Sequence, residues 1–142
     1  MHLVDANVLL YAVNRAAPRH AGAREWLDAA LANEEPVGFA WTVILAFLRL
    51  ATNPAVFARP LRATDAIATV EAWLGQPAAS VVDPTARHVG ILRGLLADTG
   101  TAGNLVSDAH LAALAVEYDA TLVSFDADFG RYRGVRWSQP GR

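Results

Sequence analysis

The chain has neither cysteine nor lysine among its 142 residues, so all 12 of its basic residues are arginine. Without cysteine, disulfides, zinc–thiolate centres and cysteine nucleophiles are excluded. Long apolar runs are also missing: none reaches the ~18 residues that a membrane span needs, and the longest candidate, 37–51, is broken by Thr42 and Arg49. The N-terminus lacks the basic segment and cleavage signature of a signal peptide. These absences predict a cytoplasmic protein without a membrane segment.

The overall composition is typical of one compact domain. Hydrophobic residues make up 54% of the chain and charged residues 18%, which is enough apolar material for a sizeable core and argues against disorder. The formal net charge of −2 excludes a polycationic nucleic-acid binder. We therefore expect a single domain over residues 1–142, with apolar surface to spare for a partner.

Short apolar runs alternate with segments of helical periodicity along the chain. The runs at 2–5, 36–41, 79–83, 120–125 and 135–137 are typical of strands. Helices are expected between them, at 7–13, 18–32, 42–52, 64–75, 84–100 and 105–119. Pro18 is expected in a first helical turn, Thr42 as an N-cap, and Asp83 as an N-cap before Pro84. Strands separated by helices predict an α/β domain with a mainly parallel sheet.

Three acids from distant parts of the chain are expected to meet at one edge of that sheet. Asp5 ends the first strand, Asp126 follows the strand at 120–125, and Asp108 lies in the first turn of a helix after the "GTAGN" loop. Functional groups of parallel sheets collect beyond the carboxyl ends of the strands. Clustered carboxylates repel one another unless cations neutralise them, and Mg²⁺ prefers such oxygen ligands. Asp128 is a fourth candidate.

Each of these acids also has a purely structural interpretation. Asp5 is suited to cap the following helix, and Asp108 to interact with a helix dipole. Asp126 and Asp128 are common turn residues. Only their combination at one sheet edge favours a metal site. The histidines show no metal-binding spacing, and His110 is expected to be structural or to lie at the rim of the site.

Three segments resemble the PIN-domain ribonucleases, and specifically the VapC-type toxins of type II toxin–antitoxin pairs. They are "LVDANVLLYA", "WTVILAFLRLATNPAVF" and "GNLVSDAHLAALAVEYDATLVSFDADF". With the helices between them, the resemblance spans essentially the whole chain. It implies a three-layer α/β/α fold with a central parallel sheet and cleavage of RNA, either tRNA or rRNA, by a Mg²⁺- or Mn²⁺-dependent endonuclease. It further implies a homodimer and inhibition by a small DNA-binding antitoxin of the VapB type.

The resemblance assigns roles to seven positions of this chain. Asp5, Asp108 and Asp126 match the family's catalytic, metal-binding acids, and Asp128 lies beside the last of them as a further metal ligand. Asn7 and Ser107 match small polar groups near the metal, and Arg49 matches a basic position that is suited to bind RNA. Arg59, Arg62, Arg131 and Arg133 are further candidates for RNA phosphate contacts.

One position departs from the family pattern. The family usually has Glu where this chain has Ala46, and no Asp or Glu occurs between Pro36 and Thr64 to replace it. The departure leaves open a one-metal site, recruitment of Asp128, or coordination completed by water. It also leaves open a PIN module that binds RNA or protein without cleaving it. An aspartyl-phosphate protein is disfavoured, because such proteins normally use a lysine near the phosphoryl group and this chain has none.

Overall fold

The computed structural model describes residues 1–99 and 105–141. It contains a five-stranded sheet in the order β3-β2-β1-β4-β5. The strands are β1 (His2–Val4), β2 (Val37–Ala40), β3 (Ala79–Val82), β4 (Thr121–Val123) and β5 (Arg136–Ser138), and every neighbouring pair is parallel. The predicted parallel sheet is confirmed, and β1 lies at its centre. The expected "GTAGN" loop and the end of the preceding helix fall on 100–104, outside the described residues.

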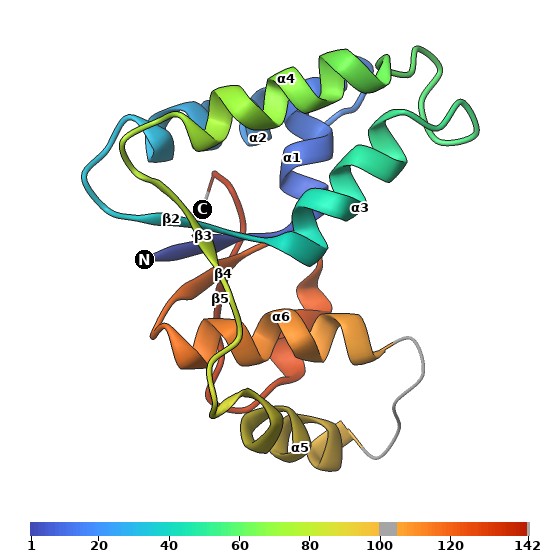
Figure 1. The fold of residues 1–142 in the computed structure, drawn as a ribbon. Coiled ribbons are helices and arrows are strands. Elements are labelled where there is room, and N and C mark those ends of the chain that lie inside the picture. The colour runs from blue at the N-terminus through green and yellow to red at the C-terminus, as the bar shows by residue number, and fades with distance from the viewer. Residues whose placement is uncertain (100–104, 142) are drawn as a thin grey trace.

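Helices cover both faces of the sheet, which gives the expected three-layer α/β/α arrangement (Figure 1). One face carries α1 (Ala6–Val13), α2 (His20–Leu31), α3 (Trp41–Ala51) and α4 (Ala63–Leu74); the other carries α5 (His88–Thr99) and α6 (Leu105–Glu117). A short 3₁₀ helix, η1 (Ala127–Arg131), follows β4. In the part of the chain that the structure describes, no helix has the length and apolarity needed to cross a bilayer.

The core is continuous between the sheet and its helices. Phe39, Ile44 and Phe47 are at most 1% exposed, and burying each of them stabilises the fold by ~1.5–3 kcal/mol. Gly38 in β2 allows close packing beneath the sheet, because a Cβ there would lie 3.1 Å from the Val82 side chain and 3.2 Å from that of Leu3. Close packing around β1 therefore holds the end of this strand, which Asp5 directly follows.

Three predicted helix starts are wrong. Helix α3 begins at Trp41, with Ala40 as an N-cap in extended conformation and no side-chain cap, so Thr42 lies inside the first turn. Helix α5 begins only at His88. Asp83 instead bonds through its backbone to the Tyr118 hydroxyl, which accepts from its N–H at 3.3 Å and donates to its carbonyl at 2.7 Å. Pro18 precedes α2, which begins at His20.

A partly buried polar network joins α6 to α5 and to the segment before α5. The Glu117 carboxylate accepts hydrogen bonds from the Thr85 backbone N–H at 2.8 Å and contacts His88 Nδ1 at 2.5 Å, and His88 Nε2 lies 2.9 Å from His110 Nδ1. Burial alone would raise the pKa of Glu117, but the bonds from Thr85 and His88 outweigh it and lower that pKa. The predicted structural role of His110 is confirmed, and the network holds the helix that carries Asp108.

Candidate active site

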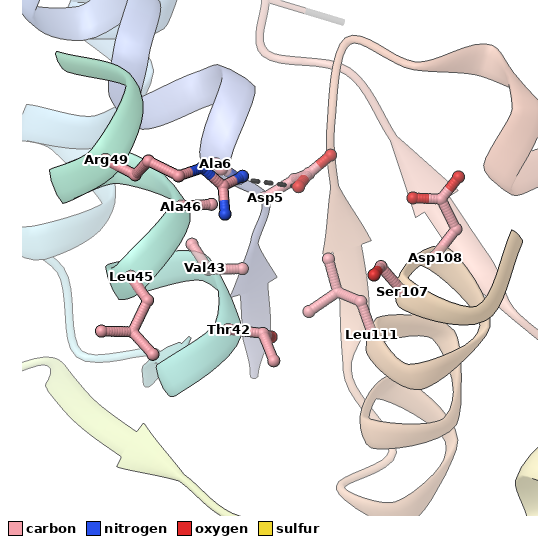
Figure 2. Close-up of a pocket in the computed structure, with 10 residues that line it drawn as sticks. All are labelled: Asp5, Ala6, Thr42, Val43, Leu45, Ala46, Arg49, Ser107, Asp108 and Leu111. Atoms are coloured by element: carbon pink, nitrogen blue, oxygen red, sulfur yellow. Dashed lines mark hydrogen bonds between the residues drawn. The ribbon is translucent and has the colours of Figure 1, made fainter. Parts of the chain in front are cut away.

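A pocket of about 380 Å³ opens between α3 and α6, beyond the carboxyl end of β1 (Figure 2). Asp5 lies at its floor. Ser107 and Asp108 line it from α6, while Ala46 and Arg49 line it from α3. The structure thus brings together side chains from three segments that are distant in sequence, because β1 and the two helices converge at one edge of a parallel sheet.

Asp5 caps α1 and at the same time faces the pocket. Its carboxylate accepts hydrogen bonds from the Ala6 backbone N–H and from the Ser124 hydroxyl, each at 2.7 Å. Burial raises the pKa of Asp5, and the negative charge of Asp126 adds to this increase, although the two hydrogen bonds counteract it. The capping interpretation is confirmed, and the same carboxylate also lines the pocket.

Asp108 lies in the first turn of α6 and is electrostatically coupled to the other acids. Burial raises its pKa, and the charges of Asp5, Asp126 and Asp128 raise it further, while Arg131 opposes them. Among the described residues, no basic side chain forms an ion pair with Asp5 or Asp108. The repulsion that the sequence predicted is therefore present and is only partly compensated by the protein.

The carboxylates of Asp126 and Asp128 differ in how free they are to bind a metal ion. The Asp126 carboxylate caps η1 by accepting a hydrogen bond from the Asp128 backbone N–H at 2.9 Å, yet its charge reaches both Asp5 and Asp108. The Asp128 carboxylate is 66% exposed and pairs with Arg131 at 2.9 Å. Because a cation already partly neutralises Asp128, it is the least suited of the four acids to bind a metal ion.

The hydroxyl of Ser124 forms hydrogen bonds with several groups of this site. The sequence analysis did not identify Ser124 as a site residue. Ser124 is fully buried; it donates to Asp5 and accepts from the Asn7 side-chain amide and the Asp126 backbone N–H, both at 3.0 Å. Asn7 also accepts from the Phe125 backbone N–H at 3.2 Å. Asn7 therefore ties the end of β1 to the segment after β4. The sequence feature that could have identified Ser124 is its position as a polar residue at the end of the apolar run "TLVS".

Replacing Ser124 with alanine should destabilise the protein by ~1–3 kcal/mol, because a buried carboxylate, an amide and a backbone N–H each lose a partner. Chemical denaturation monitored by tryptophan fluorescence measures this loss. Ser107→Ala is the matched control: Ser107 lines the same pocket but is exposed, so its loss should cost less than ~0.5 kcal/mol. Equal stability of the two variants would contradict the assigned role of Ser124.

The arginines predicted to hold RNA are not gathered in one place. Arg49 lines the acidic pocket, and Arg131 pairs with Asp128 beside it. Arg59 lines a separate pocket next to Asn14, Arg15 and Phe57, and Arg133 lines a groove beside α5. Arg62 immediately precedes α4. The position of Arg49 fits the predicted phosphate contact, whereas Arg59 and Arg133 face other surfaces.

The donor set of the pocket fits a hard divalent cation. Within residues 1–99 and 105–141, no three His, Asp or Glu side chains are grouped as a complete set of metal ligands. Mg²⁺ needs no such set, because it keeps several waters and commonly uses one or two protein carboxylates. Asp5 and Asp108 offer carboxylate oxygens to the same pocket, and their raised pKa values reflect an environment that a cation would relieve.

Comparison with known proteins gives the same assignment over the whole chain. The family model described as "PIN domain" matches residues 2–135. The chain is 56% identical over 140 residues to Ribonuclease VapC37 of Mycobacterium tuberculosis, covering 99% of this chain and 97% of that protein. It is 40% identical over 142 residues to Ribonuclease VapC33 of the same species, covering 100% and 99%. The chain therefore belongs to the PIN-domain family, among the VapC ribonucleases.

Solved structures share the fold at low sequence identity. VapBC2 from Rickettsia felis, whose structure was determined bound to a DNA fragment from its promoter, matches with a TM-score of 0.71 and 17% identity, over 97% of both chains. VapC20 of Mycobacterium tuberculosis, described as a Sarcin-Ricin loop cleaving toxin, matches with a TM-score of 0.68 and 20% identity, over 96% of this chain and 99% of that one. At this identity the likeness supports the fold.

Proposed function

We propose that this protein is the toxin ribonuclease of a toxin–antitoxin pair, and that it cleaves RNA endonucleolytically with Mg²⁺ or Mn²⁺. The observation that carries the proposal is the pocket in which Asp5 and Asp108 face each other with raised pKa values, in a chain 56% identical to a VapC ribonuclease. Such a site costs stability unless a cation occupies it. Clustered carboxylates with shifted pKa values are typical of catalytic sites, where the lost stability is tolerated for function.

In this proposal Asp5, Asp108 and Asp126 hold the cation, with Asp128 as a weaker candidate. When bound, the cation lowers the pKa of water and stabilises the charge that develops on the phosphate. Ser124 and Ala6 hold the Asp5 carboxylate in place through their hydrogen bonds. Arg49, exposed at the wall of the pocket, binds a phosphate oxygen of the RNA and orients the scissile bond.

The partner that controls this activity is proposed to be a VapB-type antitoxin. Trp41 and Leu45 of α3 are 51% and 57% exposed, and Leu45 also lines the acidic pocket. Exposed apolar side chains at the mouth of a pocket favour protein contact. A partner that covers Leu45 would also block entry of RNA. The homodimer and the cytoplasmic location stay predictions.

A second candidate is a PIN module that binds RNA or protein without cleaving it. Ala46 favours it, because this residue faces the pocket where the family usually supplies a carboxylate (Figure 2). We rank it second because Asp5, Asp108 and Asp126 are all retained and mutually coupled. A module that no longer cleaved RNA would have no need for three carboxylates whose mutual repulsion lowers the stability of the fold.

Incubation of the antitoxin-free protein with total cellular RNA separates the two candidates. We expect discrete fragments with Mg²⁺ or Mn²⁺, none with a chelator, and none with Asp5→Asn, since asparagine keeps the helix cap but removes the charge. Asp28→Asn is the control, because Asp28 lies on the surface of α2 and pairs with Arg24. Intact RNA with a folded protein and either metal would favour the binding module.

A further inference from the structure

The guanidinium of Arg19, at the start of α2, lies against the segment that leads from β4 into Asp126. Its Cζ atom is 4.8 Å from the centroid of the Phe125 ring, and Nη1 donates a hydrogen bond to the Phe125 carbonyl at 3.5 Å. The Tyr11 ring packs against the same Phe125 ring, with the centroids 5.3 Å apart. Stacking and a hydrogen bond therefore hold this exposed cation in one place.

One peptide group joins this cation to the acidic site. The Phe125 carbonyl that accepts from Arg19 belongs to the same peptide group as the Asp126 N–H, which donates to the Ser124 hydroxyl at 3.0 Å. Ser124 in turn donates to the Asp5 carboxylate at 2.7 Å. The guanidinium and the Asp5 carboxylate are thus connected through a single peptide group and a single hydroxyl.

The sheet order gives Asp5 an arginine from each of its two sides. Strand β1, which Asp5 follows, lies between β2 and β4. Helix α3, which carries Arg49, follows β2, and Phe125, on which Arg19 stacks, follows β4. An RNA strand carries a negative charge at every nucleotide. A strand that crosses the sheet edge with one phosphate at Asp5 would therefore present a neighbouring phosphate on the side of Arg19.

The positive charge of Arg19 is not neutralised by a carboxylate of the protein. Across residues 1–99 and 105–141, Arg19 forms no ion pair, whereas Arg131 and Arg136 each pair with an aspartate. In the same residues, the bond to Phe125 is the one hydrogen bond that its guanidinium makes. A guanidinium has five N–H donors in a planar fork, and a phosphate accepts two parallel bonds from such a fork. The remaining donors of Arg19 are therefore suited to an anion.

We propose that Arg19 is a substrate-binding residue of the acidic site and binds an RNA phosphate next to the one that is cleaved. The inference rests on the proposed function, which supplies RNA as the substrate. Stacking on Phe125 orders the side chain before RNA arrives, so less conformational entropy is lost on binding. Arg19 forms neither an ion pair nor a hydrogen bond with the carboxylates proposed to hold the cation, so it acts on RNA and not on the metal ion.

Fluorescence anisotropy of a labelled, mixed-sequence single-stranded RNA, titrated with protein in the presence of a chelator, tests this role without cleavage. Arg19→Met is expected to weaken RNA binding by about tenfold, the effect of losing a charged hydrogen bond. It should also reduce the slope of log Kd against log salt by about 0.7, as expected for one phosphate contact with a single strand. Methionine keeps an unbranched stem that packs on Phe125.

Two further variants serve as controls for charge and for geometry. Arg24→Met removes the same charge from the same helix, but Arg24 pairs with Asp28, so its RNA affinity should stay close to that of the parent. Arg19→Lys keeps the charge without the planar fork. It should retain the salt dependence of the parent while losing part of the affinity. Mn²⁺ binding, measured by electron paramagnetic resonance, should be the same in Arg19→Met and in the parent.

The outcomes distinguish this inference from the proposed function. Parent-like RNA affinity in Arg19→Met, or an equal loss in Arg24→Met, would overturn the role of Arg19. Weaker Mn²⁺ binding in Arg19→Met would also overturn it, and would make Arg19 a residue that positions the peptide group between Phe125 and Asp126. Arg19-dependent RNA binding by a parent that cleaves no RNA with Mg²⁺ or Mn²⁺ would support the inference while contradicting the proposed cleavage.

Discussion

Asp108→Asn is expected to reduce RNA cleavage by about 100-fold or more, because the cation that stabilises the transition-state charge loses one of its ligands. Asparagine is nearly isosteric, so the pocket keeps its shape while one negative charge disappears. Cleavage of total RNA at saturating Mg²⁺, followed over time, measures the loss. Asp65→Asn is the matched control, because Asp65 occupies the first turn of α4 as Asp108 occupies that of α6. Its cleavage rate should equal that of the parent.

The same substitution should leave the metal-free protein as stable as the parent or more stable. The pKa of Asp108 is raised in the folded state from its ordinary 3.8, so the folded protein binds the proton more tightly than the unfolded chain. Folding stability therefore falls as pH rises from about 3.8 through the raised pKa. The advantage of Asp108→Asn in Tm should be present at pH 7 and vanish below the ordinary pKa. A large loss of stability at pH 7 would instead make Asp108 a structural residue.

Ala46→Glu is expected to strengthen Mn²⁺ binding by about tenfold or more, because ligand charge largely sets the affinity of carboxylate sites. Ala46 is half-buried on α3 and lines the pocket opposite Ser107 and Asp108 (Figure 2). A glutamate there restores the carboxylate that the family usually has. The Mg²⁺ concentration for half-maximal cleavage should fall accordingly. Calorimetric titration with Mn²⁺ gives the affinity directly.

Ala46→Gln separates charge from size in this experiment. It introduces a side chain of the same length without a carboxylate, so it should leave Mn²⁺ affinity close to that of the parent. Without metal, Ala46→Glu should be less stable than Ala46→Gln, because the added charge joins those of Asp5 and Asp108. Unchanged affinity in Ala46→Glu would show that Ala46 is not the position from which the family places its glutamate in the site.

The sheet and the meeting of the acids could be predicted from the sequence because both depend on strand ends. Asp5 and Asp126 follow apolar runs, and parallel strands carry such residues to a common edge. Asp108 was placed correctly because it opens a long periodic helix. The positions of helix starts could not be predicted as well. Thr42 has the right chemistry for an N-cap, yet the N-cap of α3 is Ala40, two residues earlier, and the helix begins at Trp41.

The residues that sequence reasoning missed act through tertiary contacts. Ser124 joins Asp5, Asn7 and Asp126, and no local pattern encodes a hydrogen bond between residues separated by more than 100 positions. Arg59 and Arg133 have suitable charge for RNA phosphates, but the fold places them in pockets other than the acidic one, so their contact with RNA stays a prediction.

The pocket formed by Asp5 and Asp108 is the central claim, and cation binding tests it most directly. Metal-free parent protein and Asp108→Asn are titrated with Mn²⁺ in parallel, and the free ion is counted by electron paramagnetic resonance. The account predicts saturable binding to the parent that Mg²⁺ competes away and that is strongly weakened in Asp108→Asn. Equal binding by both proteins, or none by the folded parent, would contradict a cation site at these acids.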